Sequence, residues 1–174
     1  MILAIFQKGA GVLKKVFTLT LMLLMIASFS VCQASISPDR MNAGGIFLGQ
    51  SLSEVVSIYG KPVSTQRIES LHKEFRYLYG RYGTTFDVTF NGKTAGREFV
   101  IAIRVAGNNG IATSDGIKVG TPVSEVKRIL GKPDKENAGS LVYSENKKDW
   151  ILKMMRFDIK NNAVVSYSVW FTDD

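Results

Sequence analysis

Cysteine and histidine are almost absent from this chain of 174 residues, which has one of each. A single cysteine cannot form an internal disulfide or a cysteine-rich zinc site, and a single histidine excludes a centre built on several imidazoles. Hydrophobic residues make up 45% of the chain and charged residues 21%, an ordinary globular composition that excludes a disordered or collagen-like chain. The length fits one domain or two very small ones.

Acidic residues are absent from residues 1–34, and this segment has the order of a secretory signal peptide. Three lysines, Lys8, Lys14 and Lys15, precede an apolar run of 14 residues at 16–29. Small residues at 28–34 end the segment. A membrane-spanning helix is the alternative, but it needs about 20 apolar residues. We therefore predict a signal peptide over 1–34 with cleavage after Ala34, and a cut near 28–30 is the alternative.

Cys32 follows the apolar run at the place where the acylated cysteine of a bacterial lipoprotein would lie. Phe29 and Val31 depart from the lipobox, which has an aliphatic residue three positions before the cysteine and Gly or Ala directly before it. Export without a lipid is therefore the favoured interpretation. Cleavage after Ala34 would leave a mature chain without cysteine, which suits an oxidising exterior. We expect the mature protein in the periplasm, in the cell envelope or secreted.

The net charge of +7 belongs partly to the predicted leader. Without its three lysines, 19 basic residues remain against 15 acidic ones, a net charge of +4. The basic residues are scattered along the chain rather than clustered. This distribution favours weak attraction to an anionic envelope or membrane surface and argues against a nucleic-acid partner.

An internal repeat is the strongest pattern in the chain. Residues 45–62 and 116–133 are identical at 10 of 18 positions when aligned with an offset of 71. The shared residues include glycines, a Ser-Glu-Val triplet and a Gly-Lys-Pro ending (Gly45/Gly116, Ile46/Ile117, Gly49/Gly120, Ser53/Ser124, Glu54/Glu125, Val55/Val126, Ile58/Ile129, Gly60/Gly131, Lys61/Lys132, Pro62/Pro133). A repeat of this kind indicates that one supersecondary unit occurs twice.

Each copy predicts a helix of two to three turns. Ser51 and Glu54 fit a capping box in the first copy. In the second copy Thr121 can cap a helix that has Pro122 at its first position. Each helix is expected to end at a glycine with positive φ in the left-handed region, and a proline then prevents its continuation (Gly60 and Pro62; Gly131 and Pro133).

Alternating apolar and polar residues predict three antiparallel strands after each helix. In this alternation Phe99 shares the apolar core face with Ile103 and Val105 while Val100 lies on the other face, and Val165 shares the core face with Tyr167 and Val169. We therefore expect an α+β fold in which two tandem helix-plus-three-strand repeats form a single antiparallel sheet with short helices on one face. The expected organisation is a first unit, a turn-rich linker and a second unit (45–106, 107–115 and 116–171).

This pattern resembles the superfamily of BamE (SmpA/OmlA)-like and beta-lactamase-inhibitor-protein (BLIP)-like proteins. The resemblance rests on a Gly-aliphatic-x-x-Gly-x-[Ser/Pro]-x-x-x-Val segment, a Gly-x-Pro ending and the three strands that follow, and it covers nearly all of 45–171. It implies a non-enzymatic envelope or secreted protein. BamE has one such unit and belongs to the outer-membrane assembly machinery, whereas the inhibitor has two units whose sheet grips beta-lactamase. This chain lacks the inhibitor's cysteines and a good lipobox.

No catalytic, cofactor or metal site is predicted. His72 has no second histidine with which to bind a metal. Ser51, Ser53 and Ser124 lack a histidine–aspartate pair and are interpreted as residues of the helix starts. The carboxylates on the predicted strands have no fixed separation that would make an acid–base pair.

Aromatic residues are the better candidates, as anchors for a protein partner. Phe157 and Phe171 are expected to face the helices, so that Trp150 and Trp170 point to the open side of the sheet together with Met154. Exposed tryptophan and tyrosine are typical interface anchors. The candidate residues are Trp150, Trp170, Met154, Tyr77, Tyr79 and Tyr82. Core or edge packing is the alternative interpretation of the same aromatics.

The sequence thus favours a non-enzymatic, exported protein-binding module. A structural protein of the envelope is the second hypothesis, and a hydrolase-type enzyme is the third.

The leader gives a first prediction. Because residues 1–34 combine a basic start with a short apolar run, we expect the chain in the envelope or secreted fraction to begin at residue 35. Intact-mass measurement and N-terminal sequencing check this. A full-length chain confined to the cytosol would contradict export, and a diacylglycerol-modified Cys32 would contradict the cleavage site.

Overall fold

The computed structural model describes residues 36–69, 73–81, 83–93, 95–145 and 151–173. These described residues belong to one compact unit. Within the described part there are ten strands, two α-helices and one short 3-10 helix. In chain order these are η1 (Pro38–Arg40), β1 (Asn42–Ala43), β2 (Ile46–Phe47), α2 (Leu52–Tyr59), β3 (Ser64–Arg67), β4 (Phe75–Leu78), β5 (Thr85–Asn91), β6 (Phe99–Ala106), α3 (Val123–Leu130), β7 (Lys135–Asn137), β8 (Ser140–Ser144), β9 (Ile151–Lys160) and β10 (Ala163–Asp173). Neither α-helix among these residues has the length and apolar character needed to cross a bilayer.

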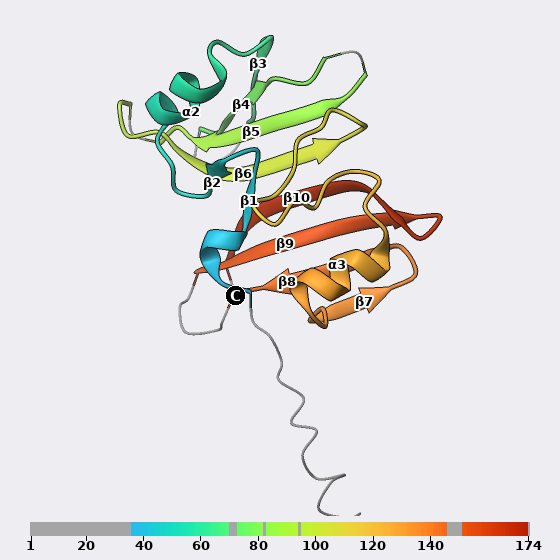
Figure 1. Ribbon diagram of the computed structural model, residues 1–174. Helices are drawn as coiled ribbons and strands as arrows, with labels where there is room; N and C mark the ends of the chain where they lie inside the picture. The colour runs from blue at the N-terminus through green and yellow to red at the C-terminus, as the bar shows by residue number, and fades with distance from the viewer. Residues whose placement is uncertain (1–35, 70–72, 82, 94, 146–150, 174) are drawn as a thin grey trace, which may run out of the picture. The chain divides into compact units, whose positions relative to one another are not determined.

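Eight of the strands form one antiparallel sheet in the order β3-β4-β5-β6-β10-β9-β8-β7 (Figure 1). Strands β1 and β2 pair separately. The two longest strands, β9 and β10, are joined by a tight turn at Asn161 and Asn162, which both have positive φ. Strand β10 then pairs with β6, so the last strand of the chain lies in the middle of the sheet.

The expected α+β class, with two tandem helix-plus-three-strand repeats, is wrong. The fold is mostly β, with one eight-stranded and one two-stranded sheet and only two short α-helices among the described residues. Two strands, β3 and β7, were missed because every residue in them is exposed and polar or charged, so they carry no hydrophobic alternation. Both are edge strands, and polar composition is what protects a sheet edge from pairing with another chain.

The helix starts differ between the two copies of the repeated segment. Helix α2 has the expected capping box, in which the Ser51 hydroxyl accepts the Glu54 N–H and the Glu54 carboxylate accepts the Ser51 N–H. In α3 the expected arrangement is wrong, because Pro122 is itself the N-cap and no side chain caps the helix. The Thr121 hydroxyl instead accepts the backbone N–H of Lys118 and closes the preceding turn.

Both helices end at a glycine with positive φ, as expected. Gly60 has φ 72° and ψ −156°, and Gly131 has φ 80° and ψ −158°. These angles lie outside the left-handed helical region that was expected, in a region that only glycine occupies readily. A tyrosine hydroxyl donates to each glycine carbonyl at 3.2 Å, Tyr79 to Gly60 and Tyr143 to Gly131.

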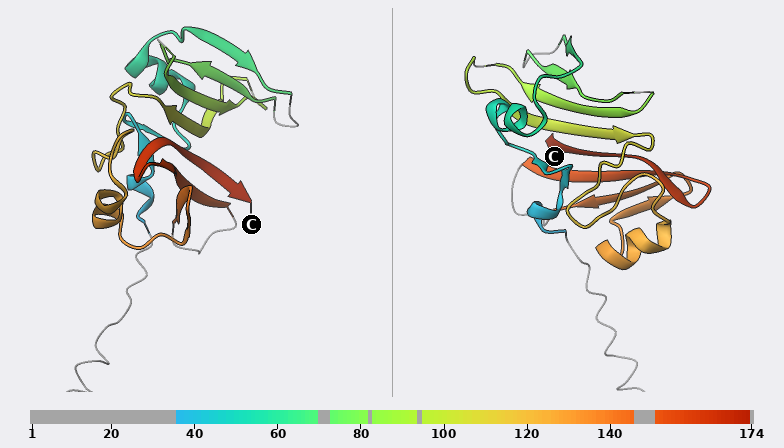
Figure 2. Two further views of the ribbon diagram at one scale, coloured as in Figure 1. Left: turned by 90° about the vertical axis from the view of Figure 1, so that its right-hand side faces the viewer. Right: turned by 45° about the horizontal axis from the view of Figure 1, so that its top comes forward.

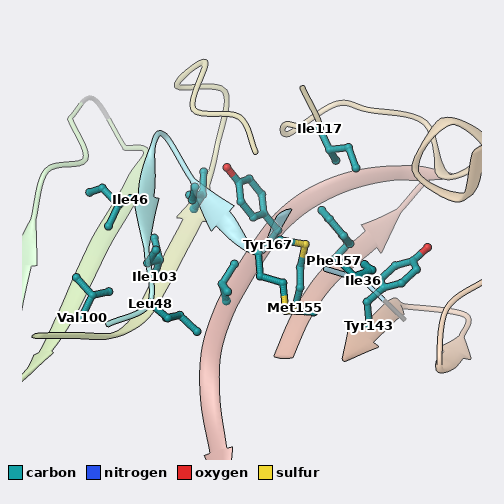
Figure 3. Close-up of a cluster of buried hydrophobic side chains, with 14 of the residues drawn as sticks. Ile36, Ile46, Leu48, Val100, Ile103, Ile117, Tyr143, Met155, Phe157 and Tyr167 are labelled. Atoms are coloured by element: carbon teal, nitrogen blue, oxygen red, sulfur yellow. The ribbon is translucent and has the colours of Figure 1, made fainter. Parts of the chain in front are cut away.

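The core lies between one face of the large sheet and the helices. Figure 2 shows α2, α3 and the N-terminal segment on the same side of the sheet. Val55 from α2 and Val126 from α3 are fully buried, in the same hydrophobic cluster as strand residues such as Phe157. Figure 3 shows how side chains from β6, β9 and β10 meet those of the N-terminal segment in this cluster.

The segment that follows the predicted leader is part of the core. Ile36, Met41 and Ile46 are at most 2% exposed. Arg40 pairs with Asp115 at 3.0 Å and also donates to the Ile129 carbonyl at the end of α3. These contacts fix residues 36–48 over the middle of the sheet.

Asn42 adds a second polar connection between this segment and the loop before α3. Its side chain donates to Ser114 Oγ at 2.8 Å and accepts the Ser114 N–H at 2.9 Å. Asn42 is 1% exposed, so both bonds satisfy polar atoms that are shielded from water.

Two β-bulges change the faces that simple alternation predicts. The pairing of β5 with β6 shifts near Phe90, which lies opposite Val100. Val100 is therefore fully buried and Phe99 is exposed, the reverse of the expected assignment. A second shift, between Val164 and Ser166, buries Val164 and leaves Val165 exposed, although Val165 was expected on the core face. Each bulge adds one residue to a strand and so exchanges the two faces on one side of it.

The helix-ending glycines give a stability prediction. We expect Gly60→Ala and Gly131→Ala each to lower the free energy of unfolding by about 1–3 kcal/mol, because a Cβ is strained at these angles. A Cβ on Gly60 would touch no atom within 4 Å, so backbone strain alone is tested there. Urea denaturation followed by circular dichroism measures the change.

Gly139→Ala is the matched control. Its φ is not in the positive range, and its Cβ would meet only the Asn137 side chain at 3.8 Å. Equal stability of all three variants would show that these helix ends tolerate ordinary residues.

Candidate functional site

The sheet has a second face that points away from the helices, which we call the open face. Its central residues alternate with the buried core residues along five strands: Arg76 and Leu78 on β4, Asp87 and Thr89 on β5, Ala102 and Arg104 on β6, Ser168 and Trp170 on β10, and Leu152, Met154, Arg156 and Asp158 on β9. In the left view of Figure 2, no described helix or hairpin covers this side of the sheet.

Trp170 lies at the centre of the open face. Its cross-strand neighbours are Ala102 on β6 and Met154 on β9. The residues before and after it, Val169 and Phe171, pack in or against the core on the other side. Trp170 and Met154 are both partly exposed, and the small Ala102 leaves the indole uncrowded on one side. The expected face for Trp170 is thus confirmed, and its role in binding stays a prediction.

Two arginines flank the next open-face residue on β10. Ser168 lies directly opposite Arg104 on β6 and directly opposite Arg156 on β9. Both arginines are exposed, and Ser168 between them is small. The resulting row Arg104–Ser168–Arg156 runs across three adjacent strands, beside the row Ala102–Trp170–Met154.

Carboxylates border this cationic row on both sides. Asp158 accepts from Arg156 Nε at 2.7 Å and from the Ser166 hydroxyl at 2.6 Å. Asp87 lies opposite Arg104 on β5. Burial raises the pKa of the Asp87 carboxyl, and the neighbouring Arg76 and Arg104 oppose that shift. Arg76 donates to the Thr89 hydroxyl at 3.3 Å.

The structure places the predicted site residues that it describes on both faces of the sheet. Tyr77 and Tyr79 are on the core side of the sheet, opposite to Trp170. Their rings lie 5.3 Å from Phe90 and 5.8 Å from Phe86, respectively, measured between ring centroids. For these two tyrosines the alternative of core packing is therefore the observed one.

Other predicted residues lie outside the described part of the chain. These are Trp150 and Tyr82 among the partner-binding candidates, together with His72 and Cys32. Of the six candidates, the structure brings Trp170 and Met154 side by side. Sequence reasoning did not single out Arg104, because its place beside Trp170 depends on the pairing of β6 with β10.

Two hollows lie away from the open face. One, of about 500 Å³, is lined by aromatic rings and two cations near the end of α2, among them Tyr59, Phe86, Lys61 and Arg81. The other, of about 640 Å³, lies beside β3 and β4 and is lined by residues including Arg67, Lys73 and Tyr77. Within the described residues, no group of three or more His, Cys, Asp or Glu side chains is placed to hold a metal ion.

Comparison with known proteins found no match: neither a protein-family model, nor a curated protein, nor a solved structure is significantly similar to this chain.

The position of Trp170 gives a spectroscopic prediction. The chain has two tryptophans, so Trp150→Phe leaves Trp170 as the single fluorophore. We expect acrylamide to quench Trp170 and iodide to quench it better than caesium, because Arg104 and Arg156 attract anions to this part of the face. Stern–Volmer constants measured at fixed ionic strength give the comparison.

Arginine variants supply the control for this measurement. Adding Arg104→Gln and Arg156→Gln should remove the preference for iodide while acrylamide quenching persists. A Trp170 that none of the three quenchers reaches would place its indole out of contact with solvent and contradict the assignment.

Proposed function

We propose that this protein is an exported, non-enzymatic protein-binding module of the bacterial cell envelope or exterior, and that it binds its partner with the open face. The observation that carries the proposal is the pair Trp170–Met154 at the centre of a sheet face that no described element covers. Large aromatic and methionine side chains are enriched at the centres of protein interfaces.

The chemistry of the surrounding residues supports the same role. Leu152, two residues from Met154 on β9, is also apolar but only 5% exposed, and Arg76, Arg104 and Arg156 lie on the same face. An apolar centre with a polar and charged rim is the usual anatomy of a recognition surface. Arginine and tryptophan are also the residues that most often dominate binding energy.

The rigidity of the scaffold also favours recognition. Met154, Trp170 and Ala102 belong to three hydrogen-bonded strands whose opposite faces carry fully packed core residues. The backbone of such strands is already ordered before binding, and a preorganised surface binds more tightly for the same contact area. The proposal also includes export, which rests on the signal-peptide pattern of residues 1–34. It includes a likeness to BamE-like and BLIP-like proteins, which rests on the repeated segment and the strands that follow it.

Site-specific photo-crosslinking tests the proposal. A photoreactive phenylalanine analogue replaces Leu78 on the open face or Ser124, an exposed residue of α3 on the other side of the molecule. Each variant is irradiated with the envelope and secreted fractions of the producing cells. We expect a defined protein adduct from position 78, its yield reduced about tenfold by Trp170→Ala, as is typical of a central anchor.

Two results would overturn the proposal. One is an adduct that forms from position 124 but not from position 78, which would place the partner on the helix side. The other is an adduct at position 78 that Trp170→Ala leaves unchanged while the variant remains folded by circular dichroism.

A further inference from the structure

The row Arg104–Ser168–Arg156 has a geometry that suits an anion. Neighbouring strands are about 4.8 Å apart, so the two arginine Cα atoms start about 10 Å from each other, on either side of Ser168. Side chains of this length can reach inward and bind one group from both sides. The serine between them is too short to fill the space above β10.

The hydrogen-bonding groups of this row are largely unused within the described chain. Arg104 is exposed and forms no ion pair within 4.0 Å in the described part of the chain, although Asp87 lies opposite it on β5 and attracts it electrostatically. Arg156 donates its Nε to Asp158, and its side chain is still 51% exposed, so part of the guanidinium is accessible to a ligand. Guanidinium groups bind carboxylates with two parallel hydrogen bonds, which makes arginine the preferred residue for such a partner.

Trp170 restricts the identity of the anion. It follows Ser168 by two residues on the same strand, which places the indole about 7 Å from the row and on the same face. A ligand that fills both positions has a negative group next to an apolar one. An acidic side chain with a neighbouring large apolar residue in a protein partner meets that requirement, whereas a polyanionic polymer offers nothing for Trp170 and Met154.

We propose that the open face recognises an acidic side chain of its protein partner between Arg104 and Arg156, above Ser168, with an adjacent apolar side chain of the same partner on Trp170 and Met154. This inference rests on the proposed function and specifies the partner's chemistry. It assigns Arg104 and Arg156 to charge recognition and Trp170 to apolar contact, so that each contribution can be removed separately.

Selection from a random peptide library displayed on phage tests the inference without knowledge of the natural partner. The library is panned on the purified processed chain, on Arg104→Gln/Arg156→Gln, and on Trp170→Ala. We expect the peptides selected by the unmodified chain to be enriched in Asp or Glu within a few residues of a large apolar residue. Acidic enrichment should fall about tenfold on the arginine variant, because the charge-assisted hydrogen bonds are lost.

Arg128→Gln is the matched control. Arg128 is an exposed arginine of α3 on the other side of the molecule, paired with Glu125 at 2.6 Å, and its loss should leave the selected peptides unchanged. Arg104→Lys should retain part of the acidic enrichment, because it keeps the charge without the paired donors. Circular dichroism of each variant checks that the fold is intact.

The outcomes separate this inference from the proposed function. Apolar peptides that depend on Trp170 but show no acidic enrichment would overturn the inference and leave the binding face standing. Acidic peptides that the Arg104→Gln/Arg156→Gln variant selects as well as the Arg128→Gln control does would also overturn the inference. Peptides that depend neither on Trp170 nor on the arginines would overturn the proposed function as well.

Discussion

The pairing of β6 with β10 is the interaction on which the rest of the structure depends. It joins residues that are more than 60 positions apart in the chain, Val105 to Tyr167 and Ile103 to Val169, and all four are at most 1% exposed. Because side chains alternate along a strand, the same pairing fixes what lies on the other face. The core contact and the juxtaposition of Arg104 with Ser168 are therefore two consequences of one register.

The N-terminal segment completes the core at this junction. Ile46 and Met41 lie over the centre of the sheet, and Tyr167 donates its hydroxyl to the Ile111 carbonyl in the loop before α3. Burial raises the pKa of the Tyr167 phenol, as expected for a hydroxyl in the packed interior. Helices of eight residues are not stable alone, so α2 and α3 depend on this common core.

One face of the sheet packs in the core and the other is open, and aromatic residues occur on both faces. The presence of an aromatic residue in a strand pattern therefore does not by itself identify a binding site. Tyr79 and Trp170 are both partly exposed, but Tyr79, which directly follows β4, donates to the Gly60 carbonyl at the end of α2 and packs beside Phe86. Among the described residues, the cross-strand neighbours of Trp170 on its face are a small residue and a flexible methionine, Ala102 and Met154. An apolar centre alone would discriminate poorly between partners. The arginines of the open face add charge, and electrostatic complementarity selects the partner and fixes its orientation.

The sequence by itself determined the local features: the capping box of Ser51 and Glu54, the glycines that end both helices, and the opposite faces of Trp170 and Phe171. These depend on neighbouring residues and on the two-residue period of a strand. Only the tertiary structure decided that polar β3 and β7 are strands, that bulges bury Val100 and expose Val165, and that Tyr77 faces the core. The same holds for Arg104 beside Trp170, because pairing between distant segments is selected by packing of the whole core and leaves no local pattern in the chain.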